Sequence, residues 1–120
     1  METSILNTIK KMLGLGADYT PFDQDIIVLI NSAFMVLSQI GIGTLDGFRI
    51  NGPDETWSDF LPNIRPFEAV KEYIYLKVKT IFDPPSNSFV QTSYENQIKE
   101  LEWRLRLRAE SGDYDVVQTG

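Results

Sequence analysis

The sequence predicts an all-α protein: a small bundle of about four helices with a Gly-rich loop or short β-hairpin inserted and a flexible C-terminal tail. Two observations predict this class. Apolar residues recur at helical spacing in four separate segments, and these segments are bounded by residues that start or stop helices, chiefly Gly and Pro. The chain has 120 residues, which is typical of one domain. We expect that domain over residues 1–110 and the tail over residues 111–120.

The first two segments predict a short helix followed by a longer, more apolar one. The short helix is expected over about residues 3–13, before a glycine-containing connector. The second begins where Thr20 caps the helix, Pro21 suits the first position and Asp23 favours the positive end of the helix dipole. It ends at Gly41 and is apolar on most sides, so neighbouring subunits are expected to supply part of its cover.

Residues 41–53 break the helical pattern with four glycines around Phe48-Arg49-Ile50. Because Asn51-Gly52 is a turn signal, this stretch predicts an irregular loop or a short β-hairpin. Thr56 then caps one helical turn, which Pro62 ends.

The third long helix is expected over residues 65–82 and stops at Asp83-Pro84-Pro85. One face carries apolar residues at helical spacing: Phe67, Val70, Ile74, Val78 and Ile81. The last helix is expected to begin with a capping box over residues 88–91 and to end near Ala109. Its apolar face is Val90, Tyr94, Ile98, Leu101 and Leu105.

Composition narrows the function. The formal net charge is −6, which argues against tight nucleic-acid binding because phosphate neutralisation needs clustered Lys and Arg. The chain has no Cys and no His, so thiol nucleophiles, Ser–His pairs and most zinc sites are absent. The N-terminus lacks the pattern of a signal peptide, and the uncharged stretch 26–45 is read as a buried helix rather than a membrane span.

No candidate catalytic, cofactor or metal site emerges from the motifs. Asp54, Glu55 and Asp59 lie close in sequence but are read as a capped, solvated turn. Gly41, Gly43 and Gly47 are not read as a dinucleotide-binding loop, because their spacing differs from that motif and they follow a predicted helix instead of a strand. We therefore expect no cofactor and no enzymatic activity.

The last helix carries a second apolar strip. Trp103 and Leu107 lie roughly opposite Leu101 and Leu105 at 100° per residue. We hypothesise that this strip contacts a neighbouring subunit, since exposed apolar patches mark interaction surfaces. The alternative is that the first helix folds over it. The β-prone tail core, residues 113–117, either adds a strand to a partner or is inert.

The segment 71–79, followed by Phe82-Asp83-Pro84-Pro85, resembles the small head–tail connector (adaptor) proteins of tailed bacteriophages. The order of elements matches the same family over about residues 3–108, including the aromatic turn Trp57-Ser58-Asp59-Phe60-Leu61. The resemblance rests on this order of elements, because no single motif in it is catalytic or diagnostic of the family.

The resemblance implies a virion neck protein that forms a ring of about twelve subunits under the portal. The ring would continue the DNA channel without gripping DNA, would offer a face to the downstream stopper protein, and would involve no membrane. Ring contacts are assigned to the last two helices, at Tyr75, Trp103, Arg104 and Leu107. Portal or stopper contacts are assigned to Phe48, Arg49, Ile50, Trp57, Tyr114, Val116 and Val117.

Two other readings remain open at this point. A helical DNA-binding phage regulator fits the chain length, but it would need a basic recognition helix, and the helices here are apolar or balanced in charge. A small metal-dependent enzyme would depend on oxygen ligands alone.

Overall fold

The computed structural model describes residues 3–43, 47–60 and 67–110, with the side chain of Phe67 excepted. These residues form α1 (Ile5–Met12), α2 (Asp23–Ile40), α3 (Trp57–Phe60), α4 (Phe67–Phe82) and α5 (Ser88–Glu110). Over these ranges there is no strand, and the one β feature is an isolated antiparallel bridge between Ser4 and Thr56. The all-α prediction is confirmed, and the described part of residues 41–53 is an irregular loop rather than a hairpin.

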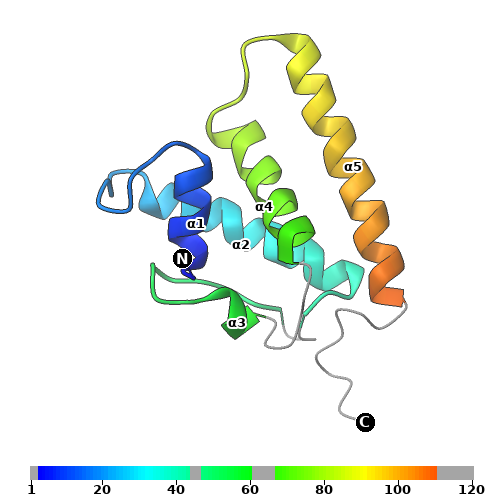
Figure 1. The fold of residues 1–120 in the computed structure, drawn as a ribbon, viewed down its shortest axis with the longest axis horizontal. Coiled ribbons are helices and arrows are strands. Elements are labelled where there is room, and N and C mark those ends of the chain that lie inside the picture. The colour runs from blue at the N-terminus through cyan, green and yellow to red at the C-terminus, as the bar shows by residue number, and fades with distance from the viewer. Residues whose placement is uncertain (1–2, 44–46, 61–66, 111–120) are drawn as a thin grey trace.

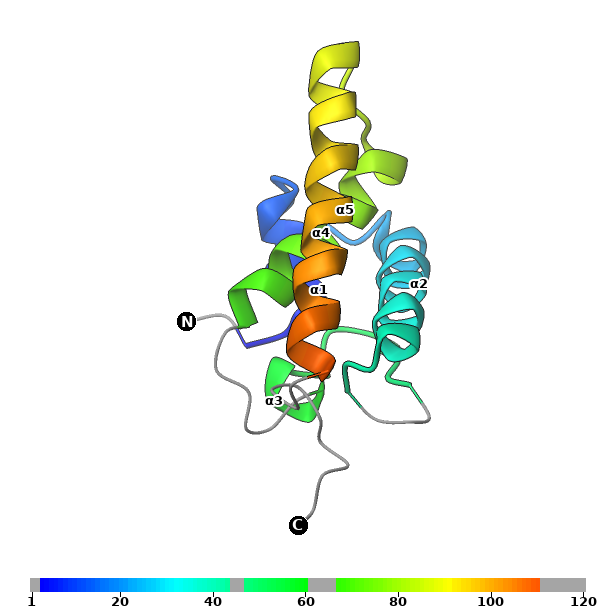
Figure 2. The same ribbon diagram turned by 90° about the vertical axis from the view of Figure 1, so that its right-hand side faces the viewer.

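Helix α4 lies at the centre of the bundle and packs against both α2 and α5 (Figure 1). Helix α1 packs on α2 and α4, away from α5 (Figure 1). The N-terminal half of α5 extends beyond the other helices, and the connection from α4 lies at that end (Figure 2). The bundle is therefore compact around α4 and leaves a large part of α5 exposed.

The core is built from one face of each helix and from the loop before α3. Its fully buried members include Ile5 and Ile9 of α1, Ile30 of α2 and Tyr73 of α4. Leu105 is the buried residue of α5. Burial of this apolar surface contributes roughly 25 cal/mol per Å² to folding, so the packing of α4 against its neighbours holds the fold together.

The N-terminus of α2 differs from the expectation. The helix begins at Asp23, and its N-cap residue Phe22 makes no side-chain cap hydrogen bond. Thr20 is not the cap, because the helix begins three residues later and Phe22 holds the N-cap position. The Thr20 carbonyl accepts a hydrogen bond from the Asp23 amide (3.1 Å), which closes a turn over Pro21 and Phe22. Asp23 does lie in the first turn as expected, and its carboxylate also faces Lys10 of α1.

The capping of α5 also differs. The side chain of Asn87, not Ser88, accepts hydrogen bonds from the amides of Phe89 (2.7 Å) and Val90 (3.3 Å). Gln91 donates to Glu95 instead of reaching back toward the N-terminus. The capping-box prediction was therefore wrong by one residue, because Asn is as good a cap as Ser and stands one position earlier.

The apolar face predicted for α4 is confirmed in its middle and wrong at its end. Val70, Ile74 and Val78 are fully buried, whereas Ile81 is 64% exposed. Ile81 lies in the last turn of α4, next to the connection to α5 (Figure 1). Phe67 lies outside the described side chains.

Two other helix signals are confirmed. Gly41 ends α2 in the left-handed conformation (φ 106°), and the amide of Ile42 donates to the carbonyl of Leu37 (2.8 Å) as in a Schellman motif. Thr56 and Asp59 exchange reciprocal hydrogen bonds between side chain and amide at the start of α3. Among the described helices, none is long and apolar enough to cross a membrane.

Candidate interaction surfaces

The outer strip of α5 is exposed. The side chain of Trp103 is 62% exposed and that of Leu107 is 45% exposed. They stand one turn apart on the same face, while Leu105 on the opposite side is fully buried against the core. Helix α1 does not cover the strip, because it packs on α2 and α4. The subunit thus presents an indole and a leucine side chain to its surroundings.

The other two residues assigned to the ring contact have different surroundings. Arg104 is exposed and forms an ion pair with Glu100 one turn earlier on α5. Tyr75 is half-buried on α4, where burial raises the pKa of its hydroxyl and the nearby Tyr94 adds to the effect. Tyr75 belongs to the α4–α5 packing more than to the outer surface.

A groove runs along the outer face of α2. Its volume is about 390 Å³, and one wall is the helix face on which Val28 is 61% and Met35 is 63% exposed. The other wall is the loop segment 47–49. The described residues that line it are Val28, Asn31, Ser32, Met35, Ser38, Gly47, Phe48 and Arg49. The apolar surface of α2 that the rest of the described chain leaves exposed therefore lies along this groove.

A pair of hydrogen bonds holds the loop wall of this groove against α2. The side chain of Asn31 donates to the carbonyl of Ile50 (3.0 Å) and accepts from the amide of Ile50 (2.8 Å). At the other end, a methyl group added at Gly47 would lie 3.8 Å from Oγ of Ser38. The loop therefore runs antiparallel to α2, beside the turns from Ser38 back to Asn31.

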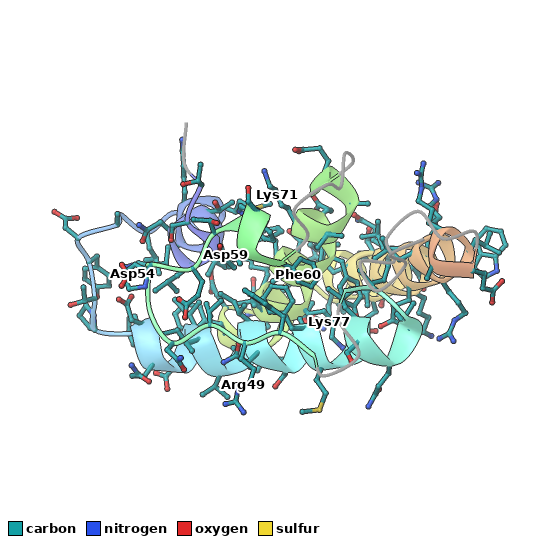
Figure 3. The ribbon with its side chains drawn as sticks, turned by 90° about the horizontal axis from the view of Figure 1, so that it is seen from below. Arg49, Asp54, Asp59, Phe60, Lys71 and Lys77 are labelled. Atoms are coloured by element: carbon teal, nitrogen blue, oxygen red, sulfur yellow. The ribbon has the colours of Figure 1, made fainter. Side chains whose placement is uncertain are left out.

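Phe48 and Arg49 point in different directions from this loop. Phe48 is half-buried and packs edge-on against Phe34, with ring centroids 5.1 Å apart, and against Phe60 at 5.4 Å. Arg49 is exposed and lies on the outer side of α2, away from Phe60 in the interior (Figure 3). Of these two side chains, only that of Arg49 is exposed.

Ile50 and Trp57, assigned at first to portal or stopper contacts, are core residues. Ile50 is fully buried, and Trp57 is 4% exposed. The indole nitrogen of Trp57 donates to Oγ1 of Thr8 (3.1 Å), and the ammonium of Lys71 lies 5.5 Å from its ring centroid. In this conformation both side chains lie in the core and not at the surface. Tyr114, Val116 and Val117 lie outside the described residues.

The acidic residues near α3 have local structural roles. Glu55 accepts a hydrogen bond from the Asn51 amide (2.8 Å), and Asp59 accepts one from Thr56. Asp54 is exposed at the surface (Figure 3). In the portions of the chain that the structure describes, no group of three or more acidic, His or Cys side chains is placed to hold a metal ion.

One exposed apolar residue was not predicted as a contact. Phe89 is 86% exposed at the projecting end of α5 (Figure 2). Phe89 lies in the first turn of α5, outside the apolar face formed by Ile98, Leu101 and Leu105. The sequence signal for its exposure was its position two residues after Asn87, which caps the helix.

The fold and these surfaces place the chain in a class of protein: it is a small all-α protein with an exposed apolar strip on α5 and a groove on α2. The family model of the phage connector protein matches residues 5–112, and the chain belongs to this family. It is thus a structural protein of a bacteriophage head–tail connector. Membership implies a place in the virion neck and association with the portal and other neck proteins. Comparisons with curated proteins and with solved structures gave no significant match.

Proposed function

We propose that this chain is one subunit of a closed ring, of about twelve copies, that docks on the portal and extends the DNA channel. The opposite face of the ring is the attachment surface for the downstream stopper protein. The family supplies the neck location, and the surfaces of the subunit support the ring.

The observation that carries the proposal is the exposure of Trp103 and Leu107 on consecutive turns of α5. Aromatic residues are enriched at the centres of protein interfaces, and Trp is a frequent hot spot. A strip on one helix cannot pair with itself around a many-membered ring, so the contact is heterologous, with a different surface on the neighbour. Arg104, next to the strip, contributes at its polar rim.

The net charge of −6 supports a channel that DNA passes without binding. Like charge between the subunits and the phosphate backbone opposes sticking, and this field is summed over every copy in the ring. Arg104 on α5 is already paired with Glu100, which reduces the cationic surface available to phosphates.

Portal and stopper contacts are proposed at the exposed Arg49, the half-buried Phe48 and the tail residues Tyr114, Val116 and Val117. Ile50 and Trp57 support this region from below, since both are buried beneath it. Arg49 supplies a long cationic side chain that suits an acidic partner.

The test is assembly of the purified protein alone and with the portal protein of its phage, followed by negative-stain imaging. Rings that form alone or only on the portal support the proposal. The Trp103→Ala, Leu107→Ala double variant should lose the rings while its free energy of unfolding stays within about 1 kcal/mol of the parent, because exposed residues contribute little to stability.

Ile81→Ala is the matched control, because Ile81 is equally exposed (64%) but lies at the end of α4. It should assemble like the parent. Wild-type rings from the double variant would refute the role of the strip. A monodisperse subunit that ignores the portal would refute the ring itself, and salt-sensitive DNA binding in that case would favour the regulator reading.

A further inference from the structure

The groove on α2 begins next to the point where the described chain ends. A methyl group added at Gly41, just after α2, would lie 3.5 Å from Cβ of Ala109 in the last turn of α5. The C-terminal ends of α2 and α5 are therefore in contact (Figure 1). Ser38, at the near end of the groove, is three residues before Gly41. Residues 111–120 follow directly from this corner.

We propose that the C-terminal segment 111–120 docks in the α2 groove of its own subunit and covers Val28 and Met35 until a partner replaces it. The proposal concerns the free subunit and does not depend on ring formation.

The length of the segment suits this path. From Ser38 back to Val28 the groove follows ten residues of α2, about 15 Å at the rise of a helix. Ten residues of extended chain span up to about 33 Å. The segment thus reaches the far end of the groove from Glu110 without any change in the helices.

The chemistry of the segment matches that of the groove. Tyr114, Val116 and Val117 supply apolar side chains for the wall on which Val28 and Met35 stand exposed. Burying that wall is favourable by roughly 25 cal/mol per Å² of apolar surface.

Charge favours the same pairing. Asp113 and Asp115 flank Tyr114, and among the described residues that line the groove Arg49 is the one with a cationic side chain. Arg49 takes part in none of the ion pairs formed among the residues that the structure describes. An Arg–carboxylate pair at the edge of an apolar contact fixes its direction as well as adding to its stability.

A docked segment also changes what the free subunit shows to others. The apolar wall of α2 and the residues Tyr114, Val116 and Val117 would cover one another, so neither is available for self-association. Binding to the portal or stopper then exchanges one occupant of the groove for another.

The test uses the full chain, which has no natural Cys, so an introduced pair reports a single contact. The Met35→Cys, Val116→Cys double variant is oxidised at low concentration without portal, and the product is read on a non-reducing gel. Disulfides form when Cα atoms come within about 7 Å. We expect an intramolecular bond, formed about tenfold faster than in the control pair Arg106→Cys, Val116→Cys. In a segment without a docking site the control would be faster, because its loop is shorter.

The charge pairing is tested in the same variant. Adding Asp113→Lys and Asp115→Lys should slow the bond several-fold, and adding Arg49→Glu as well should restore much of the rate. Equal rates for the groove and control pairs would overturn the proposal. Disulfide-linked dimers as the main product would also overturn it, since they would place the segment on another copy.

Discussion

The ammonium nitrogen of Lys10 lies 2.8 Å from Oδ1 of Asp23 and joins α1 to the first turn of α2. The Lys10 side chain is almost fully buried, whereas that of Asp23 is 22% exposed. The ammonium also donates a hydrogen bond to the carbonyl of Ala17 (3.1 Å). A buried charge is stable only with such partners, so this pair fixes how α1 sits on α2.

Removing the carboxylate should be more harmful than removing the ammonium. Asp23→Ala leaves a buried cation and is expected to lower the free energy of unfolding by about 3 kcal/mol. Lys10→Met should lower it less, because Asp23 still reaches water and Met fills the space. Urea unfolding followed by circular dichroism measures both. Asp25→Ala, in the same helical turn but exposed, controls for the helix dipole. Additive losses in the double variant would contradict coupling between the two charges.

The hydroxyl of Tyr73 donates a 2.7 Å hydrogen bond to the carboxylate of Glu102 and links α4 to α5. Burial, followed by this hydrogen bond and the negative charge, raises the pKa of Tyr73 well above its ordinary value of 10. Tyr73→Phe should lower the free energy of unfolding at pH 7 by about 1.5 kcal/mol, because a bond to a charged group is lost.

The pH dependence of that loss has a definite sign. The native state holds the Tyr73 proton more tightly than the unfolded state, so the contribution is fully present below pH 10 and is lost as pH rises above it. The difference between parent and Tyr73→Phe should therefore be constant to about pH 9 and shrink beyond pH 10. Chemical unfolding at several pH values measures it. A difference that grows above pH 10 would contradict the assignment.

The two hydrogen bonds from Asn31 to Ile50 hold the loop wall of the groove. Asn31→Leu should lower the free energy of unfolding by about 2 kcal/mol and speed hydrogen exchange of the Ile50 amide. Asn31→Asp keeps an acceptor for that amide but loses the donor to the carbonyl, so it should preserve protection better than Leu. Ser32→Ala, exposed and adjacent, is the control. Unchanged exchange in Asn31→Leu would show that packing alone holds the loop.

Gly43 is required for two reasons that can be separated. Its φ is 93°, and an added methyl group would lie 2.8 Å from Cε1 of Phe60. Gly43→Ala should cost about 2 kcal/mol through overpacking and strain. Gly14→Ala has the strain (φ 86°) in open space and should cost about 1 kcal/mol. Gly52→Ala has neither and should stay within about 0.5 kcal/mol. Thermal unfolding ranks the three, and equal losses would contradict the ordering.

Helical periodicity predicted the elements well because the core is simple. Val70, Ile74 and Val78 are all buried at the spacing that a helix requires. The helix starts were less predictable, since several residues near a start compete as caps. Asn87 replaced Ser88, and the Thr20 side chain was not used at all. Asn and Ser cap helices about equally well, so tertiary contacts decide among them.

The exposure of the residues assigned to contacts was predicted in part. The outward direction of Trp103 followed from its angle to Leu105, and the structure places it at the surface. The burial of Ile50 and Trp57 did not follow from the sequence, because it depends on contacts with Asn31 and Thr8 far along the chain. The partners of Lys10 were equally invisible, since nothing in a sequence marks a lysine that turns inward.

The described segment 47–60 is attached at both ends. Asn31 holds its start at Ile50. Near its end, the Ile5 amide donates to the Glu55 carbonyl (3.0 Å), and the Trp57 amide donates to the Thr3 carbonyl (3.2 Å). Its conformational entropy is therefore lost during folding rather than during binding. Arg49 therefore stands on a segment that is already ordered before any partner binds.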